Sequence, residues 1–571
     1  MAVDLTSTEQ IRDGLLQHFQ YNELDEGEIL SECVNVCKNY HITPENFYYK
    51  WEAVKYSPNS PTISVFTADS IKQIKANIQR DALAEQMKQK PRVQLNGRMS
   101  RSKGPVVGLS GWMGAPVKKP FAATPSTPDA SAAVAGPSRV KFAGPSNGPE
   151  AVEKRAYRYM YEKVSERSEV LDDRIDEFAG LIRDHYSITE FGDPASCTDE
   201  DVTIVGRIVS DVESAAPKLN DASIVLESSK MMGSGARMPL RFDPQLKIRG
   251  AEGAGGIGLF PGAIAALNGK NGGGGYFLVN EILTLPPLKT RPVDPYGEDS
   301  STSVWVASGS FTSEMDLSYK PLVDLLKKAK TRQPDALVLL GPFIDANHTH
   351  IKTGNTDLTP AQLFQTHFLD GLTDFLAASP GSIVVVVPST KDILSDHPVF
   401  PQSELRVDLA YHPRIHFVPN PCCFSLNGVT FGASTVDVLF HLRKEELFKC
   451  DTADSSPAGD SMANLCRHLL QQRSFYPLFP VPVELSHDVN LDVSHSRGLR
   501  IYPEGPDMYS PDVLVLPSRL KQFSKVVEDS VAINPSFLTK GVYAEVRLPG
   551  RRTASLKDEI IVELARLDGM S

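Results

Sequence analysis

The chain has 571 residues and a hydrophobic fraction of 41%, enough for several domains with packed cores. Its 70 acidic residues outnumber 59 basic ones, and the formal net charge of −11 argues against a protein that coats nucleic acid by itself. No run of about 20 apolar residues is present, so we expect no membrane span. The first residues are acidic rather than basic and then apolar, so we expect no signal peptide.

The seven cysteines are odd in number, and none forms a CxxC pair or a zinc-ribbon spacing. We therefore expect reduced cysteines in an intracellular protein, in the cytosol or the nucleus. No cofactor site of the chain's own is predicted.

Residues 1–80 have the apolar spacing of short helices. Thr43 and Pro44 read as an N-cap followed by proline at the first helical position. The segment predicts a small helical bundle, which is either a packed core and nothing more or a docking module tethered to the rest. Its apolar positions at helical spacing are Ile11, Leu15, Leu16, Phe19, Phe47, Trp51 and Val54.

Residues 81–150 are dominated by Pro, Gly, Ser and Ala, and their ten basic against four acidic side chains give a local charge of +6. Such a segment cannot bury enough apolar surface to offset its ordering entropy, so it predicts a disordered linker. Thr124 and Thr127 each precede a proline and are candidate phosphorylation sites, with an unmodified spacer as the alternative.

Residues 151–197 carry the stripe of an amphipathic helix, expected over Val152–Tyr186, that leads into the next domain. Residues 198–295 then change to short strands bounded by Gly-rich turns, which favours a small Greek-key barrel of the OB type. Such barrels bind single strands through aromatic side chains on a basic groove. The few aromatics here fit core positions as well, so we favour a structural barrel; they are Phe242, Phe260, Tyr276 and Phe277.

Residues 296–571 alternate continuous apolar strands with helices, which predicts a mostly parallel or mixed sheet with both faces covered. A helix is expected over Tyr319–Lys330, and another begins at the Thr359-Pro360 cap. The strands are expected at Val304–Ala307, Leu337–Leu340, Ile383–Val387 and Asp512–Leu516.

The ends of these strands lack the ligands of a two-metal phosphoesterase. Such enzymes hold two ions about 3.5 to 4 Å apart with Asp, His and Asn side chains that follow buried strands. In their motifs, Asp-x-His, Gly-Asp-x-x-Asp, Gly-Asn-His-Asp/Glu and Gly-His-x-His occur in that order. The corresponding positions here are Ser308 and Ser310, Pro342 and Asp345, Thr390 and Lys391, and Ser518 and Leu520. Only Asp345 keeps a metal-binding side chain, and Lys391 and Arg519 would oppose cations electrostatically. The sequence thus predicts an inactive site without metal.

One segment could be mistaken for a metal motif. Asn347-His348-Thr349-His350 contains an Asn-His and a His-x-His, but it lies in the loop after the second strand, where a solvated loop is expected. An active metal-dependent phosphodiesterase would have to use Asp345, His348 and Asp392.

The whole length resembles the regulatory B subunit of DNA polymerase alpha–primase in a fungal-like form. The segments that carry the resemblance are Leu340–His348, Pro419–Gly428, Phe431-Gly432, Asp437–Leu442, Gln471–Pro480 and Asn534–Gly541. B subunits of polymerases delta and epsilon share the domain order and are the alternative. The N-terminal module with its long linker and the segment Arg473–Pro477 favour alpha.

The resemblance implies a multidomain α+β protein: an N-terminal helical bundle, an OB-fold barrel and an inactivated calcineurin-like phosphoesterase α/β sandwich. It implies a nuclear, non-catalytic scaffold in DNA replication that grips the zinc-bearing C-terminal domain of the catalytic subunit and joins primase through the complex. The N-terminal module would recruit other replication factors, and the linker would be phosphorylated. Contact with DNA would be weak or shared with a partner.

Overall fold

The computed structural model describes residues 8–19, 28–39, 42–55, 71, 74, 138–145, 149–157, 160–211, 218–250, 255–292, 301–406, 412–450, 460–503, 508–550 and 556–567. The chain divides into two compact units, Met1–Thr127 and Pro128–Ser571. Thr124 and Thr127 lie outside the described residues. Every helix among the described residues is too short or too polar to span a lipid bilayer.

The described residues of the first unit include the helices α1 (Thr8–His18), α2 (Glu28–Asn39) and α3 (Pro44–Lys55). The Oγ1 atom of Thr43 accepts a hydrogen bond from Asn46 N at 3.2 Å, as expected of an N-cap. One hydrophobic cluster joins the three helices, and its fully buried members include Leu15, Cys33, Phe47 and Trp51.

The second unit contains a closed five-stranded barrel of order β2-β3-β4-β7-β6. The β4–β7 pair is parallel and the other four pairs are antiparallel, which is the strand order of an OB fold. Phe260 and Phe277 are buried in its core, while Phe242 and Tyr276 are half-buried. The strands are β2 (Val202–Ser210), β3 (Ile224–Glu227), β4 (Arg237–Arg249), β6 (Ile264–Lys270) and β7 (Phe277–Leu283).

The helix predicted over Val152–Tyr186 is broken in the structure. A short helix α5 (Pro149–Lys154) ends well before α6 (Val164–Tyr186), and Met160 between them has a positive φ of 55° and is 83% exposed. The break follows because residues before Val164 bury no face against the barrel. From Leu171 onward α6 packs on the outside of β2 and β6 through Ile175, Phe178 and Ile182.

Two six-stranded sheets form the rest of the second unit. In the first sheet, of order β11-β10-β9-β8-β18-β19, strands β8 to β11 are parallel and β18 and β19 run antiparallel to their neighbours. Its strands are β8 (Thr302–Ser308), β9 (Ala336–Leu340), β10 (Ile383–Val387), β11 (Ile415–Phe417), β18 (Val542–Leu548) and β19 (Ile561–Arg566).

The second sheet has the order β1-β12-β13-β15-β17-β16, with β13, β15 and β17 parallel. Its edge strand β1 lies in residues that composition predicted as the end of the linker. A separate pair, β5 (Ile257–Leu259) with β14 (Leu447–Lys449), connects the barrel to this part of the chain. The strands of the second sheet are β1 (Phe142–Ala143), β12 (Cys422–Leu426), β13 (Val429–Ala433), β15 (Val513–Val515), β16 (Phe523–Val527) and β17 (Ser530–Asn534).

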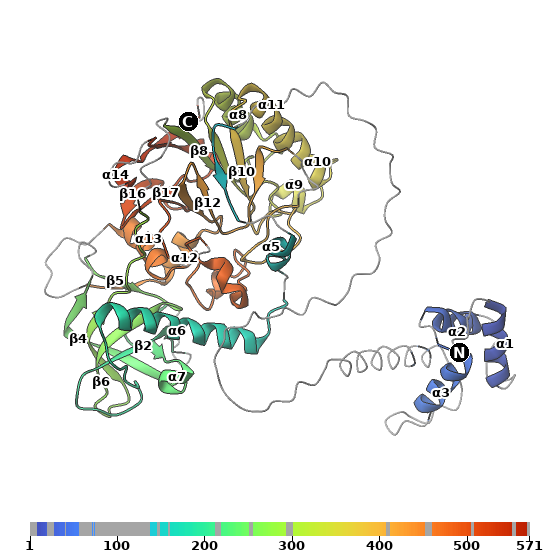
Figure 1. Ribbon diagram of the computed structural model, residues 1–571, viewed down its shortest axis with the longest axis horizontal. Coiled ribbons are helices and arrows are strands. Elements are labelled where there is room, and N and C mark those ends of the chain that lie inside the picture. The colour runs from blue at the N-terminus through green and yellow to red at the C-terminus, as the bar shows by residue number, and fades with distance from the viewer. Residues whose placement is uncertain are drawn as a thin grey trace. The chain divides into compact units, whose positions relative to one another are not determined.

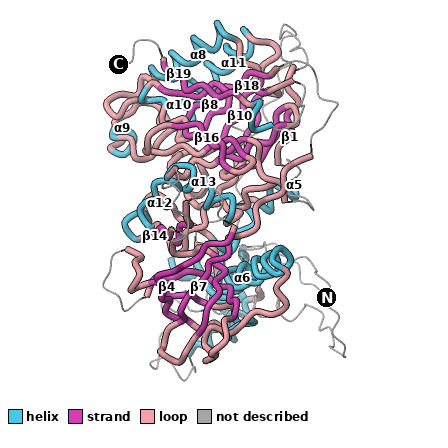
Figure 2. The backbone as a smooth tube through the Cα atoms, turned by 90° about the vertical axis from the view of Figure 1, so that its left-hand side faces the viewer, coloured by secondary structure: helices cyan, strands magenta, loops and turns pink. Residues whose placement is uncertain are grey.

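The two sheets face each other across one apolar cluster to which both contribute, so they form a sandwich. Helices α8 (Lys320–Arg332), α10 (Pro360–Phe364) and α11 (Asp370–Ala378) cover the outer face of the first sheet, with the π-helical turn η1 (Gln365–Leu369) joining α10 to α11. Helices α12 (Val438–Glu445) and α13 (Ser461–Gln471) cover the second sheet and share a continuous core with the barrel (Figures 1 and 2). The mixed α/β content and the barrel are as predicted.

The remaining helical elements among the described residues are short and lie at the ends of strands or inside loops. They are α7 (Lys230–Gly233), α9 (Thr349–Lys352), η3 (Val483–Leu485), η4 (Val493–Leu499), η5 (Leu538–Lys540) and α14 (Leu556–Glu559).

Candidate functional site at the strand ends

The carboxyl ends of β8, β9 and β10 meet at one edge of the first sheet, because these strands are parallel and in register. Ser308 ends β8 and is buried. The hydroxyl of Ser310 donates to Asp345 Oδ2 at 3.3 Å, so the structure brings these two predicted positions together. Pro342 follows β9 and offers no donor or acceptor from its side chain.

Asp392 lies at the centre of this edge and has a structural role. Its carboxylate accepts hydrogen bonds from the backbone N–H of Phe343, of Ile344 at 2.9 Å and of Ser389 at 2.8 Å. Burial raises the pKa of Asp392 to about 7, opposed by these three N–H donors. The side chain therefore ties the loop after β9 to the loop after β10, and its lone pairs are already engaged.

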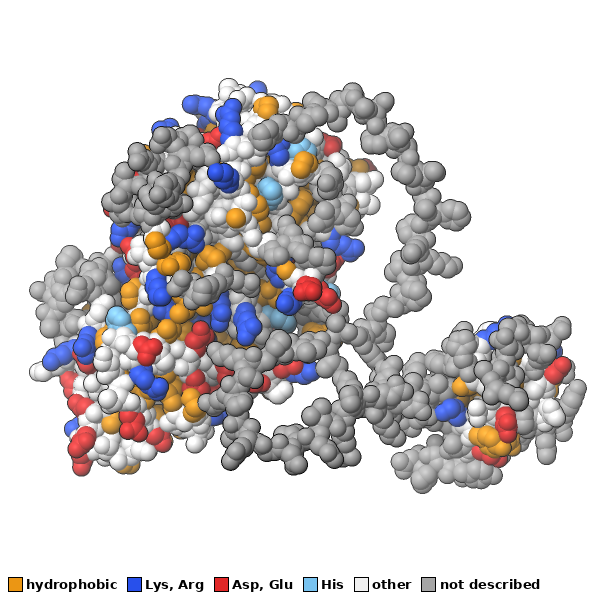
Figure 3. Space-filling model, in the orientation of Figure 1, with side chains coloured by type: hydrophobic (Ala, Val, Ile, Leu, Met, Phe, Trp, Pro, Cys, Tyr) orange, Lys and Arg blue, Asp and Glu red, His pale blue; other side chains and the backbone are white. Residues whose placement is uncertain are grey.

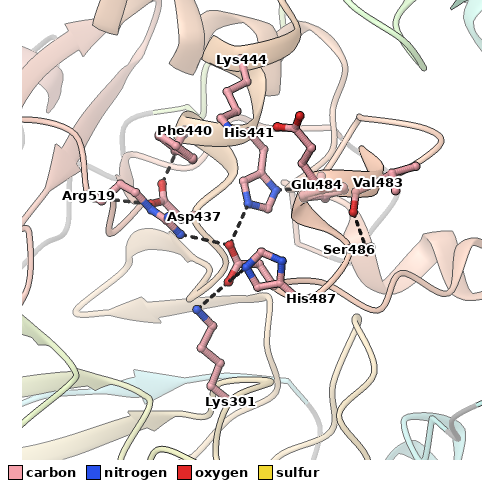
Figure 4. A network of polar contacts seen from close by, with 12 residues as sticks. Lys391, Asp437, Phe440, His441, Lys444, Val483, Glu484, Ser486, His487 and Arg519 are labelled. Atoms are coloured by element: carbon pink, nitrogen blue, oxygen red, sulfur yellow. Dashed lines mark hydrogen bonds and ion pairs between the residues drawn. The ribbon is translucent and has the colours of Figure 1, made fainter. Parts of the chain in front are cut away.

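Asp488 lies in the loop after η3, and three basic side chains from different parts of the chain converge on it. Lys391 Nζ lies 2.8 Å from Asp488 Oδ1, and Arg519 Nη2 lies 3.1 Å from Oδ2. His441 Nε2 is 3.7 Å from Oδ2, beyond hydrogen-bond distance. Figure 4 shows Lys391, His441 and Arg519 pointing toward this point. Together His441, Lys391 and Arg519 hold the pKa of Asp488 well below its usual range.

Arg519 is fixed by a second carboxylate and an aromatic ring. Its Nε atom lies 3.0 Å from Asp437 Oδ2, and its own backbone N–H donates to the same oxygen at 2.9 Å. The guanidinium carbon lies 4.4 Å from the centroid of the Phe440 ring, a cation–π distance. Asp437 also caps α12 by accepting from Phe440 N. The cation of Arg519 is thus held beyond the end of β15, between Ser518 and Leu520, the two positions at which a histidine ligand was sought in the sequence.

A chain of buried polar groups continues from Asp488 into the core. His441 is fully buried, and its Nδ1 lies 2.9 Å from the hydroxyl of Tyr476. Tyr476 belongs to the segment that connects α13 to the barrel side of the molecule, and burial raises the pKa of its phenol well above the usual range. The strand ends are therefore linked to the joint between sandwich and barrel.

An amide network fills the neighbouring space. Gln402 donates to the carbonyl of Ser389 at 2.9 Å, and Asn420 donates to Gln402 Oε1 at 3.1 Å. Asn420 also donates to Thr435 Oγ1 at 2.7 Å, and Thr435 in turn donates to the carbonyl of Pro388 at 3.1 Å. These side chains cross-link the ends of β10 and β13 directly.

The segment Asn347–His350 is only partly the solvated loop that we expected, since Asn347 and Thr349 are exposed but His348 is not. His348 is buried, and its Nε2 lies 2.8 Å from the carbonyl of Ser313 and 3.1 Å from that of Asp316. Its Nδ1 accepts from His350 N and caps the short helix α9. Both ring nitrogens of His348 are thus bound to backbone, which explains the apparent His-x-His motif as a link between two loops.

The last pair of predicted positions also has local roles. Ser518 is buried, and its backbone N–H donates to Asn534 Oδ1 at 2.9 Å. Leu520 is partly buried and packs against the apolar core that the barrel shares with the second sheet and its helices. Thr390 is half-buried beside Lys391.

Within the part of the chain that the structure describes, no three or more His, Cys, Asp or Glu side chains are grouped so that they could hold a metal ion. Asp345, His348 and Asp392, the ligands that an active phosphodiesterase would need, make separate contacts with backbone and hydroxyl groups. The donor set does not fit a two-metal centre.

Sequence reasoning missed several side chains of this site: Gln402, Asn420, Thr435, Asp437, His441, Tyr476 and Asp488. Their signal is weak, because none follows a predicted strand in a recognisable metal motif. Asn420 and Asp437 do stand in the segments Pro419–Gly428 and Asp437–Leu442, which carry the family resemblance. Asp488 has no comparable signal.

Comparisons with known proteins give a consistent result. The family described as the B subunit of DNA polymerases alpha and epsilon matches residues 304–525, and the family described as the OB domain of the DNA polymerase alpha B subunit matches residues 168–285. The chain is 33% identical over 565 residues to the DNA polymerase alpha B subunit of Schizosaccharomyces pombe, covering 91% of this chain and 92% of that protein.

More distant relatives carry the same name. The protein of Mus musculus is 33% identical over 395 residues, which cover 68% of this chain and 60% of the mouse protein. The protein of Saccharomyces cerevisiae is 32% identical over 439 residues, which cover 69% of this chain and 60% of the yeast protein. A solved structure from Thermus thermophilus matches at 10% identity and a TM-score of 0.19, covering 47% of this chain and 100% of that one, which is too weak to support an argument.

Proposed function

The chain belongs to the family of DNA polymerase alpha B subunits, and from this membership we propose that it is a non-catalytic, regulatory subunit of a nuclear DNA polymerase alpha–primase complex. The assignment to DNA polymerase alpha rests on relatives that are named as its B subunit. The absence of catalysis is our own inference.

The observation that carries this inference is the Asp488 network. Lys391 and Arg519 place two cations at the ends of β10 and β15, and both are bound to one carboxylate. Divalent ions at the same strand ends would be repelled by these cations. The contacts support a site in which ion pairs and amide hydrogen bonds fix the loops at the strand ends. In a two-metal hydrolase the metal ions would fix these loops.

We propose further that the sandwich is an inactivated phosphoesterase-like domain. Two facing sheets with parallel central strands, helices on the outer faces and polar side chains at the carboxyl ends support this architecture. The proposed division is a helical docking domain at 1–80, a linker from 81, a helical lead-in to 197, an OB domain at 198–295 and the phosphoesterase-like domain at 296–571.

The barrel and sandwich together would grip the zinc-bearing C-terminal domain of the catalytic subunit. Three features support a single gripping body: the continuous core, the β5–β14 pair and the hydrogen bonds between Gln472 and Ile264. Figure 3 shows apolar side chains gathered over the middle of one face, with basic side chains among them. An exposed apolar patch bordered by polar side chains supports an interaction surface on this face.

The first unit would recruit other replication factors, with Thr124 and Thr127 near its C-terminal boundary as candidate phosphorylation sites. Primase would be reached through the complex. Contact with DNA would be shared with the catalytic subunit, since the net charge of −11 does not favour independent binding.

Co-purification with the catalytic subunit tests this function. The full chain and a chain of residues 138–571 should both retain the C-terminal domain of the catalytic subunit, whereas residues 1–137 alone should not. A 138–571 chain that is folded by circular dichroism but fails to bind would contradict the assignment of barrel and sandwich as the grip.

A further inference from the structure

Residues 138–145 precede all the other described parts of the second unit and run across the open side of the sandwich. The two-residue strand β1 pairs antiparallel with β12, placing Phe142 opposite Leu426 and Ala143 opposite Ser425. Strand β12 would otherwise be the edge of the second sheet. Composition gave no sign of this strand, because the surrounding residues are rich in Pro, Gly, Ser and Ala.

The side chains of this segment alternate in burial. Val140 is 5% exposed and belongs to the apolar cluster between the two sheets, and Phe142 packs against the same cluster. Arg139, Lys141 and Ala143 are exposed. A period of two over these residues is the pattern of a half-buried strand, so the segment has one face made to bind the sandwich.

Phe142 contacts both sheets. Its ring stacks on His416 of β11 with the centroids 4.1 Å apart and the planes 14° apart, and it lies 6.1 Å from the ring of Phe424 in β12. Since β11 is the edge of the first sheet and β12 borders the second, one side chain covers the seam between them.

Hydrogen bonds fix the segment on either side of the strand. Arg139 N donates to the carbonyl of Gly381 at 3.0 Å, and the N–H of Asn427 donates to the carbonyl of Lys141 at 3.0 Å. Lys141 N donates to Asn427 Oδ1 at 2.8 Å. A Cβ atom at Gly381 would lie 2.7 Å from the side chain of Arg139, so this glycine gives the segment room to approach.

We propose that residues 138–145 are a built-in docking segment that closes the seam between β11 of the first sheet and β12 of the second. The surface it occupies, formed by β12, His416 and Gly381, is a binding site for a short strand with apolar side chains two residues apart. The linker predicted over residues 81–150 therefore contains an ordered strand at Phe142–Ala143. On this proposal the segment is separable, because one short strand pair and the side chains of Val140 and Phe142 attach it to the sandwich.

Hydrogen exchange of the full chain, read by mass spectrometry, tests this. Residues 139–143 should exchange at least about tenfold more slowly than unstructured backbone. Val140→Asp places a carboxylate on the buried face and should return residues 139–143 to the unstructured rate, with faster exchange at Asn427. Lys141→Asp introduces the same carboxylate on the exposed face and should leave both segments protected.

Strands β9 and β10 in the same samples report whether the sandwich stays folded. Retained protection there together with loss at 139–143 supports a separable docking segment. The proposal is overturned by unstructured rates at 139–143 in the unchanged chain, or by equal behaviour of the two variants. Loss of protection in β9 and β10 with Val140→Asp also overturns it, because the segment would then be an inseparable part of the core.

Discussion

Asp488 is the residue at which three basic side chains meet at the strand ends. Its side chain is 9% exposed, whereas those of Lys391 and Arg519 are 34% and 43% exposed. A buried carboxylate is stable only if its partners remain in place, and removing one partner leaves an uncompensated charge. The network thus stabilises the loops at the strand ends, and we expect the loss of Asp488 alone to weaken it.

Asp488→Asn should lower the free energy of unfolding of the second unit by about 1–3 kcal/mol near neutral pH, a range reduced by the partial exposure of both cations. Asp374→Asn, which breaks the exposed 3.4 Å pair with Lys330, is the matched control and should cost less than about 0.5 kcal/mol. Thermal unfolding of both variants against the unchanged chain checks this. Equal losses would remove the special role of Asp488.

The same variant should change the dependence of stability on pH. The pKa of Asp488 is lower in the folded than in the unfolded chain, so its contribution is fully present above the unfolded value and is lost as the pH falls below it. The difference between the two chains should be constant from about pH 5 to 8 and shrink below about pH 4. A difference that grows on acidification would show that Asp488 does not titrate as inferred.

Asp392→Asn should also be destabilising, because an amide nitrogen cannot accept from the backbone N–H of Ser389. Leaving that buried donor unpaired costs about 1–3 kcal/mol. Asp345→Asn is the matched control at the same edge, where the Asp345 carboxylate bonds the hydroxyl of Ser310 and the exposed N–H of Asn347. Urea unfolding should show a clearly smaller loss for the control.

The degenerate ligand positions could be proposed from sequence because each expected motif is local and follows a continuous apolar strand, and their loss of metal remains a prediction. What fills their place could not be proposed in this way. Asp488 lies far from Lys391 and Arg519 along the chain, and nothing in its neighbours indicates that a loop would carry it to the strand ends. The buried position of His348 was missed for the same reason, since its partners are backbone carbonyls of another loop.

The joint between barrel and sandwich is made by the residues that follow α13. Gln472 accepts from Ile264 N at 3.0 Å and donates to Ile264 O at 2.9 Å. Its side-chain amide thus pairs with the backbone of the first residue of β6 as a residue of an adjacent strand would. Arg174 of α6 donates to the carbonyl of Gln472 at 2.7 Å, and Arg473 donates to the carbonyl of Pro286 at 3.2 Å. Three elements thus meet at two consecutive residues.

Gln472→Ala should weaken this joint by about 2 kcal/mol, because the backbone groups of Ile264 lose buried partners. Faster hydrogen exchange of β6 should accompany the loss. Gln365→Ala removes an exposed glutamine that bonds Asp370 and should leave both stability and β6 exchange unchanged. A loss of stability without faster exchange in β6 would place the effect elsewhere.

Elements with strong periodicity were predicted well, including α8, the capped helix at Pro360 and the buried strands β9 and β10. The failures occurred where tertiary contacts override local pattern. Apolar residues before Val164 continue the helical spacing, but Met160 and Tyr161 are exposed and Tyr157 packs against His495 of η4, so α6 starts later. Strand β1 forms in a segment rich in Pro, Gly, Ser and Ala because β12 offers unpaired backbone groups beside it.

At the scale of the whole molecule, the second unit combines a barrel and a sandwich through one continuous core. The strand order of the barrel could be anticipated only as a fold class, since pairing between distant strands leaves little trace in a single sequence. Family membership agrees with the prediction over nearly the whole length. The central inference is that ion pairs and amide groups have taken the place of catalytic metals.

The most direct test is the metal content and phosphodiester hydrolysis of the chain purified without its catalytic partner, after incubation with Mn²⁺ or Zn²⁺ and removal of free metal. We predict well under one ion per chain and no hydrolysis above the buffer control. Two ions per chain, with Mn²⁺-dependent cleavage abolished by Asp345→Ala, would contradict a non-catalytic site.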